Sequence, residues 1–140
     1  MWTGASRHPP ENERARLDSS AWIECLDGGP NTPHFAPVLR RLPGLIIPAI
    51  VLTEVRKAVL KQRTREQADD IARTMRTGEI VSIDEDIALA AADVFIQFKL
   101  PLADSFIYAV SRARNATLWT QDEHFKDLPH VKYFPKRKAH

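Results

Sequence analysis

The chain has 140 residues, 44% of them hydrophobic, and a formal net charge of +2 at pH 7, which suits one domain with its own core. Its one cysteine, Cys25, excludes an intrachain disulfide framework, and no Cys or His spacing matches a zinc site. No apolar run approaches the ~18 residues of a membrane span, so we expect a soluble, cytoplasmic protein without a membrane partner.

Short apolar segments alternate with helical ones along most of the chain. Residues 1–13 are polar and aperiodic, and we expect them to be a disordered extension outside the fold. The expected strands lie near residue 17 and at 45–47, 80–83, 117–119 and 131–133, and the expected helices begin at residue 19 and cover about 49–63, 65–77, 86–99 and 103–114. This alternation predicts a three-layer α/β sandwich with a mostly parallel sheet over residues 14–135, followed by a basic flexible tail at 136–140.

The first expected strand has an unusual sequence. Arg14 and Arg16 flank Ala15 where a central strand would be buried on both faces. Either this strand is short and begins at the sheet edge, or the native start differs from this one. Trp22 and Trp119 fall in apolar patterns, so we expect both in the core.

Four acidic residues each follow an expected strand or open a helix near its end: Asp18, Glu54, Asp104 and Asp122. If the strands lie side by side, these carboxylates converge beyond one edge of the sheet. Like charges at close range repel, so such a cluster normally exists to hold a cation. Oxygen ligands suit Mg²⁺ or Mn²⁺, and the pattern therefore predicts a metal-dependent enzyme.

Two of these acidic residues also have a simpler interpretation. Asp18 could act only as the cap of the helix that follows it, because exposed helix N–H groups favour an oxygen acceptor. Glu54 could be an ordinary ion-pair partner of Lys57 or Lys61 on its own helix.

The other two have competing interpretations as well. The helix dipole alone could stabilise Asp104 in a first helical turn, although its place above apolar residues favours a ligand role. Asp122 could be a turn residue, with Glu123 as the ligand instead. The acidic run at residues 84–86 is typical of a solvated helix cap, and we leave it out of the site.

Basic residues gather near one expected helix end and in the tail. Lys57 and Lys61, with Arg63, Arg65 and the tail residues 136–138, could follow a phosphate backbone, although a charged helix face is more often merely solvated. We take Lys57 and Lys61 as the candidate substrate-binding residues.

Four sequence blocks carry a resemblance to a known family. They are LDSSAWIE, VLTEV, PLADSFIYA and LWTQDEHF, in this order from residue 17 to 125. Together they resemble the PIN domain, and in particular the VapC-type toxins of prokaryotic toxin–antitoxin pairs. The resemblance implies an Mg²⁺-dependent endoribonuclease that cuts RNA, is commonly a homodimer and is inhibited by a cognate antitoxin. It maps the family's acidic positions onto the four residues above, and its strand-end Ser/Thr onto Ser19 and Thr120.

The residues suggest a division of roles in phosphodiester hydrolysis. We expect Asp18 and Asp104 to ligate the principal ion, and Asp122 to bind it directly or through water. Glu54 would orient the attacking water or help to hold a second ion. Ser19 and Thr120 would donate hydrogen bonds to these ligands.

Other classes of protein remain open at this point. A phospho-accepting receiver domain has a similar size, but it would need Asp84 as acceptor and a lysine at the end of the last strand, where Lys132 fits poorly. A third possibility is a PIN-fold binding module without activity. No GxxxxGK[ST] sequence is present, which excludes a P-loop nucleotide enzyme.

Overall fold

The computed structural model describes residues 14–138, so the expected extension at 1–13 lies outside the described residues. Its strands are β1 (Ala15–Leu17), β2 (Ile46–Pro48), β3 (Glu79–Val81), β4 (Thr117–Thr120) and β5 (Val131–Tyr133). Its helices are α1 (Ser19–Asp27), α2 (Thr32–Leu39), α3 (Ala49–Gln62), α4 (Arg65–Met75), α5 (Glu85–Phe98), α6 (Leu102–Ala113) and the 3₁₀ turn η1 (Glu123–Phe125).

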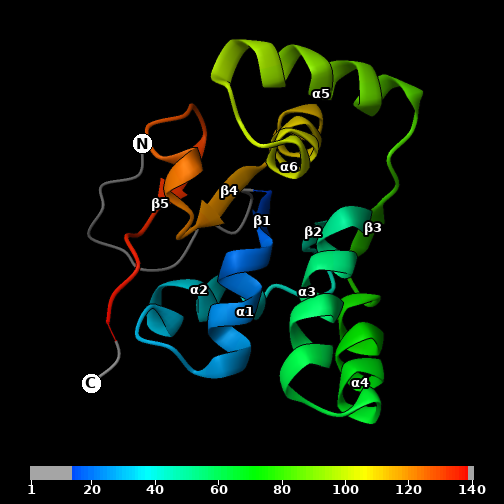
Figure 1. Cartoon of the computed structure of the whole chain (residues 1–140), viewed down its shortest axis with the longest axis vertical. Helices are drawn as coiled ribbons and strands as arrows, with labels where there is room; N and C mark the ends of the chain where they lie inside the picture. Colours follow the sequence, from blue (N-terminus) through cyan, green and yellow to red (C-terminus); the bar gives the residue numbers. More distant parts are fainter. Residues whose placement is uncertain (1–13, 139–140) are drawn as a thin grey trace.

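All the strand pairs in residues 14–138 are parallel. β1, β4 and β5 pair in that order, and β2 pairs with β3. β1 and β2 also contact each other, which places the two small sheets in one layer (Figure 1). The carboxyl ends of all five strands therefore face one edge of that layer, as the parallel arrangement requires.

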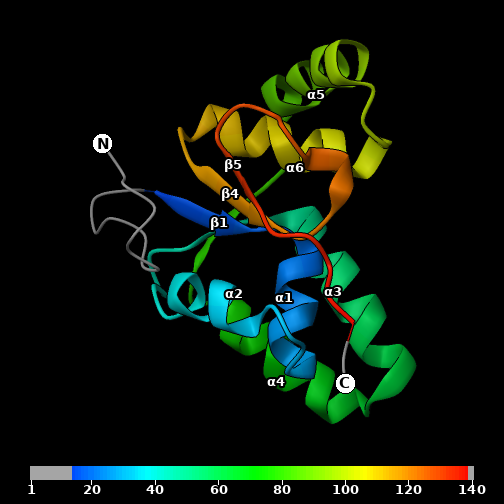
Figure 2. The same cartoon turned by 90° about the vertical axis from the view of Figure 1, so that its left-hand side faces the viewer.

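Helices cover both faces of the sheet. In Figures 1 and 2, α5 and α6 lie on one face, and α1 to α4 lie on the other. α6 contacts β4 from the first face, whereas α1 contacts β1 and β4 from the second and α3 contacts β2. The predicted three-layer α/β sandwich with a parallel sheet is confirmed.

The first strand is short and carries a buried charge. β1 has three residues, all buried, and Arg16 between Ala15 and Leu17 is fully enclosed. Side chains alternate along a strand, so Arg16 faces α6, where its Nη1 donates a hydrogen bond to the Ile107 carbonyl oxygen. The arginine that conflicted with a buried strand in the sequence is thus bound to the backbone of the neighbouring helix.

Most of the expected elements are present, with boundaries shifted by one or two residues. The sequence interpretation did not include α2, although its residues 32–39 form a regular helix with Pro33 near its start and Pro37 inside it. Trp22 and Trp119 are each 2% exposed, as expected for core residues. Within residues 14–138, no helix has the length and apolar character needed to cross a membrane.

Candidate active site

Asp18 lies at the carboxyl end of β1, directly before α1. Its carboxylate accepts a hydrogen bond from the Ala21 backbone N–H at 3.0 Å, so it does cap the helix. It also accepts hydrogen bonds from Ser20 Oγ at 2.8 Å and from Thr120 Oγ1 at 2.7 Å. Burial raises the pKa of Asp18 to about 6, although these hydrogen bonds and the charge of Arg16 act in the opposite direction. Asp18 is therefore a buried carboxylate and not only a surface cap.

Glu54 projects from the second turn of α3 toward the start of α1. Val51 and Val55 bury the adjacent side of α3, which fixes the direction of Glu54. The Ser19 hydroxyl donates a hydrogen bond of 2.7 Å to the Glu54 carboxylate. Ser19, which follows Asp18 in the chain, thus links Glu54 to the end of β1.

Asp104 lies in the first turn of α6, and its side chain is 14% exposed. Burial is the main cause that raises its pKa to about 7, and the charge of Asp122 is the next. Asp18 and Glu54 raise the pKa of Asp104 further through their charges, while His124 lowers it. Asp104 and Asp122 therefore lie together, and Asp18 and Glu54 are near enough for their charges to act on Asp104.

Asp122 follows β4 and begins the turn η1. Its carboxylate oxygen Oδ1 accepts a hydrogen bond of 3.0 Å from the His124 backbone N–H. The Asp122 backbone N–H in turn donates to Thr120 Oγ1 at 2.9 Å. Thr120 therefore connects the two acidic residues Asp18 and Asp122 at the ends of neighbouring strands.

The sequence interpretation missed His124. Its Nδ1 lies 2.8 Å from Asp122 Oδ1 and 3.4 Å from Asp104 Oδ2. The ligand atoms of these three residues all lie within 4.8 Å of one another, whereas Glu123, the alternative to Asp122, is exposed and outside this group. The available signal was a histidine two residues after a predicted ligand.

Two hollows adjoin the carboxylates. One, of about 330 Å³, is bordered by Ser19 and Glu54 together with Lys57 and Lys61. The other, of about 460 Å³, runs from Asp122 and His124 to the chain segment after β5 and ends at Lys136. Arg63 instead donates to the Leu26 carbonyl oxygen and to Asp27, so its guanidinium is held against α1.

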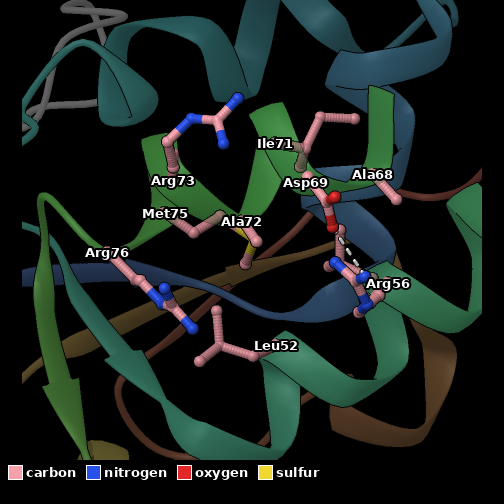
Figure 3. Close-up of a pocket in the computed structure, with 10 residues that line it drawn as sticks. Leu52, Arg56, Ala68, Asp69, Ile71, Ala72, Arg73, Met75 and Arg76 are labelled. Atoms are coloured by element: carbon pink, nitrogen blue, oxygen red, sulfur yellow. Dashed lines mark hydrogen bonds and ion pairs between the residues drawn. The ribbon is translucent and has the colours of Figure 1, made fainter. Parts of the chain in front are cut away.

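A third hollow lies between α3 and α4, away from the acidic residues. It has a volume of about 320 Å³, and an ion pair of 2.8 Å between Arg56 and Asp69 crosses it (Figure 3). Leu52 and Arg56, which line it, are each two positions from Glu54, about 200° around the helix. This groove is therefore separate from the candidate active site.

The acidic run after β3 has a structural role. Asp84 caps α5 by accepting a hydrogen bond of 2.9 Å from the Ile87 backbone N–H. Leaving residues 84–86 out of the site agrees with this geometry. A cap at the start of α5 also gives no support to Asp84 as the phosphate acceptor of a receiver domain.

The comparisons with known proteins agree with this architecture. The PIN domain model matches residues 16–131, and the chain belongs to the PIN domain family. No curated protein matches the chain.

Solved structures of toxins share the fold. A chain of a toxin–antitoxin complex from Klebsiella pneumoniae is 25% identical, with a TM-score of 0.71 over 84% of this chain and 95% of that one. A chain of VapBC2 from Rickettsia felis, bound to a promoter DNA fragment, is 19% identical, with a TM-score of 0.68 over 86% of this chain and 98% of that one. Mycobacterium tuberculosis VapC20, a toxin that cleaves the sarcin-ricin loop, is 15% identical with a TM-score of 0.66 over 84% and 96%. The resemblance to VapC-type toxins is thus confirmed for family and fold.

Proposed function

We propose that this protein is a divalent-metal-dependent endoribonuclease, the toxin of a toxin–antitoxin pair. The observation that carries the proposal is the gathering of three further carboxylates around Asp104, whose pKa rises to about 7 through burial and the charges of Asp122, Asp18 and Glu54. Acidic groups that destabilise one another's charged forms are characteristic of functional sites. Membership of a family that includes an RNA-cleaving toxin supports the choice of reaction.

The donor atoms fit a hard divalent cation. Asp18, Asp104 and Asp122 offer carboxylate oxygens at one edge of the sheet, and Mg²⁺ and Mn²⁺ prefer such ligands. The cation would supply positive charge beside the scissile phosphate and lower the pKa of a water. It would also offset the repulsion that raises the pKa of Asp104.

The remaining residues bind and orient the reactants. Glu54, which accepts a hydrogen bond of 2.7 Å from Ser19, would accept a proton from the attacking water. Thr120 keeps the Asp18 carboxylate fixed through its hydrogen bond. Lys57 and Lys61 border the hollow next to Glu54 and would bind the phosphates of an RNA strand.

A cognate antitoxin and a second copy of the chain are the proposed protein partners. The solved relatives include VapBC and FitAB toxin–antitoxin complexes, which supports an antitoxin partner here.

Leu89 and Ile96 on α5 and Leu102 on α6 are 64%, 74% and 65% exposed. Three large apolar side chains that are this exposed on neighbouring helices support a homodimer through this face. Sedimentation of Leu89→Glu/Ile96→Glu beside wild type tests it, because a dimer through this face would become monomeric and any other arrangement would be unchanged.

RNA cleavage by purified protein tests the enzymatic proposal. Labelled tRNA, rRNA and mRNA are incubated with wild type, Asp104→Asn or Glu54→Gln, in Mg²⁺, in Mn²⁺ and in EDTA. We expect wild-type cleavage that requires a metal. Glu54→Gln should lose at least about 100-fold, the usual effect of removing an acid–base group, and Asp104→Asn should lose activity because it lacks a ligand to the metal. Asp86→Asn removes an exposed carboxylate outside the site and should cleave normally. Cleavage in EDTA, or by Asp104→Asn at the wild-type rate, would contradict the proposal.

A further inference from the structure

His124 is positioned over the acidic cluster by its own turn. η1 is anchored by Phe125, which is fully buried, and capped by Asp122. These two neighbours fix the backbone on both sides of His124. Its side chain is 55% exposed, so the imidazole lies at the open side of the cluster and not in the core.

The distances between the donor atoms suit a shared cation. Two ligands that each lie about 2.1 Å from one octahedral ion are separated by about 3 Å when adjacent. His124 Nδ1 lies 2.8 Å from Asp122 Oδ1 and 3.4 Å from Asp104 Oδ2, close to this spacing. The same three residues thus bring one nitrogen and two oxygen donors to one point.

The Nδ1 atom of His124 can be a hydrogen-bond donor or a metal ligand, according to which ring nitrogen carries the proton. In its neutral form one ring nitrogen carries the proton and the other holds a free lone pair. With the proton on Nδ1, His124 donates a hydrogen bond to Asp122. With the proton on Nε2, the Nδ1 lone pair is free to bind a cation held by the two carboxylates.

We propose that His124 is a direct metal ligand and that it makes the site selective for a first-row transition cation such as Mn²⁺ over Mg²⁺. Imidazole nitrogen suits transition metals, whereas an all-oxygen site suits Mg²⁺. This inference rests on the proposed function, because it assigns a ligand to the same ion. His124, which lies in η1, would then determine which cation the site of this chain prefers.

Electron spin-echo spectroscopy of bound Mn²⁺ tests the ligand directly, because the unpaired electrons couple to a coordinated ¹⁴N nucleus. We expect a ¹⁴N coupling in the wild-type protein loaded with one equivalent of Mn²⁺ and its loss in His124→Gln. His130→Asn is the matched control, since His130 is exposed and its φ of 62° is a conformation that asparagine tolerates. This control should retain the coupling.

Competition between the two cations provides the second readout. In His124→Gln, Mn²⁺ affinity should fall roughly tenfold or more, the usual loss when a group around a metal is removed, while Mg²⁺ affinity should change much less. Mn²⁺ that binds without ¹⁴N coupling, but is lost in Asp104→Asn, would overturn the role of His124 and leave the proposed function intact. Failure of wild type to bind either cation would overturn both.

Discussion

Thr120 Oγ1 donates a hydrogen bond of 2.7 Å to Asp18 Oδ2 and so joins the ends of the paired strands β1 and β4. Both residues are buried, and the same hydroxyl accepts a hydrogen bond from the Asp122 backbone N–H at 2.9 Å. One small side chain therefore sets the relative positions of two acidic residues from different strands.

Replacing Thr120 by valine should weaken this arrangement without changing its shape. Asp18 loses a donor in a buried place, and the Asp122 N–H loses its acceptor, so the free energy of unfolding should fall by about 1–3 kcal/mol. The pKa of Asp18 should also rise above about 6, because the hydrogen bond from Thr120 lowers it. Urea unfolding at pH 7 measures the stability. Thr120→Ser keeps the hydroxyl and should lose less, and a Thr120→Val variant as stable as wild type would show that this hydroxyl does not stabilise the strand ends.

The metal-free protein should lose stability as the pH rises through the acidic range. Asp18 and Asp104 have pKa values of about 6 and about 7 in the folded chain, above their ordinary value of 3.8. Between these limits the folded chain binds more protons than the unfolded chain, so unfolding becomes easier with rising pH. Each such proton contributes a slope of at most about 1.4 kcal/mol per pH unit. Urea unfolding in EDTA from pH 4 to 8 measures this dependence.

The same experiment with Asp104→Asn isolates one carboxyl group. The variant lacks the group with the higher pKa, so its stability should change little between pH 6 and 7 and should equal or exceed that of wild type at pH 7. If Asp104 were only a residue stabilised by the helix dipole, the substitution would instead cost about 0.3–1 kcal/mol. A lower stability of Asp104→Asn in EDTA at pH 7 would show that the carboxylates do not repel in the metal-free site.

Local sequence patterns were sufficient to predict most of the fold. The first three strands are short segments that are each followed by a helix-forming segment, and this alternation shows without tertiary information. α2 was missed because Pro33 and Pro37 are expected to interrupt a helix. In the structure Pro33 lies near the start of α2, where its missing N–H has no cost, while Phe35 and Val38 are buried in the core and hold the helix in place.

The acidic residues of the candidate site were predictable from the sequence. Asp18 and Asp122 follow apolar strands, and parallel pairing places such residues at one edge. The positions of His124 and Arg16 depend on which segments pack against them. The position of His124 requires the turn after Asp122 to fold back toward α6. The position of Arg16 requires a backbone carbonyl oxygen of α6 opposite β1. No local pattern reports either contact.

Arg16 should be replaceable by methionine with no loss of stability, or with a gain. Burial lowers the pKa of its guanidinium to about 9, so the charge costs free energy at neutral pH. Its Nε and Nη2 are buried and have no hydrogen-bond partner among residues 14–138. Exchanging buried charged groups for apolar ones of similar volume is often neutral or stabilising by about 1–4 kcal/mol. Arg14→Met is the control, because Arg14 is exposed and pairs with Glu79 at 3.3 Å. A large loss with Arg16→Met alone would show that the bond to Ile107 outweighs the cost of burial.

Lys57 and Lys61 should bind RNA through its phosphates and contribute no metal affinity. They border the hollow beside Glu54 and are exposed, so each can neutralise one phosphate of a strand entering the site. Each single-stranded phosphate contact contributes roughly 0.7 to the slope of log affinity against log salt, so Lys57→Gln/Lys61→Gln should lower the slope by about 1.4. Fluorescence anisotropy with labelled RNA and the inactive Asp104→Asn background measures it.

Two measurements give this prediction its control. Lys99→Asn removes one positive charge at the end of α5, in the layer opposite α3, and should leave the slope unchanged. Mn²⁺ affinity of the double lysine variant in the wild-type background should also stay at the wild-type value, because neither lysine supplies a ligand. An unchanged slope in the double variant would mean that the RNA backbone follows another path, and the hollow that ends at Lys136 is then the next surface to test.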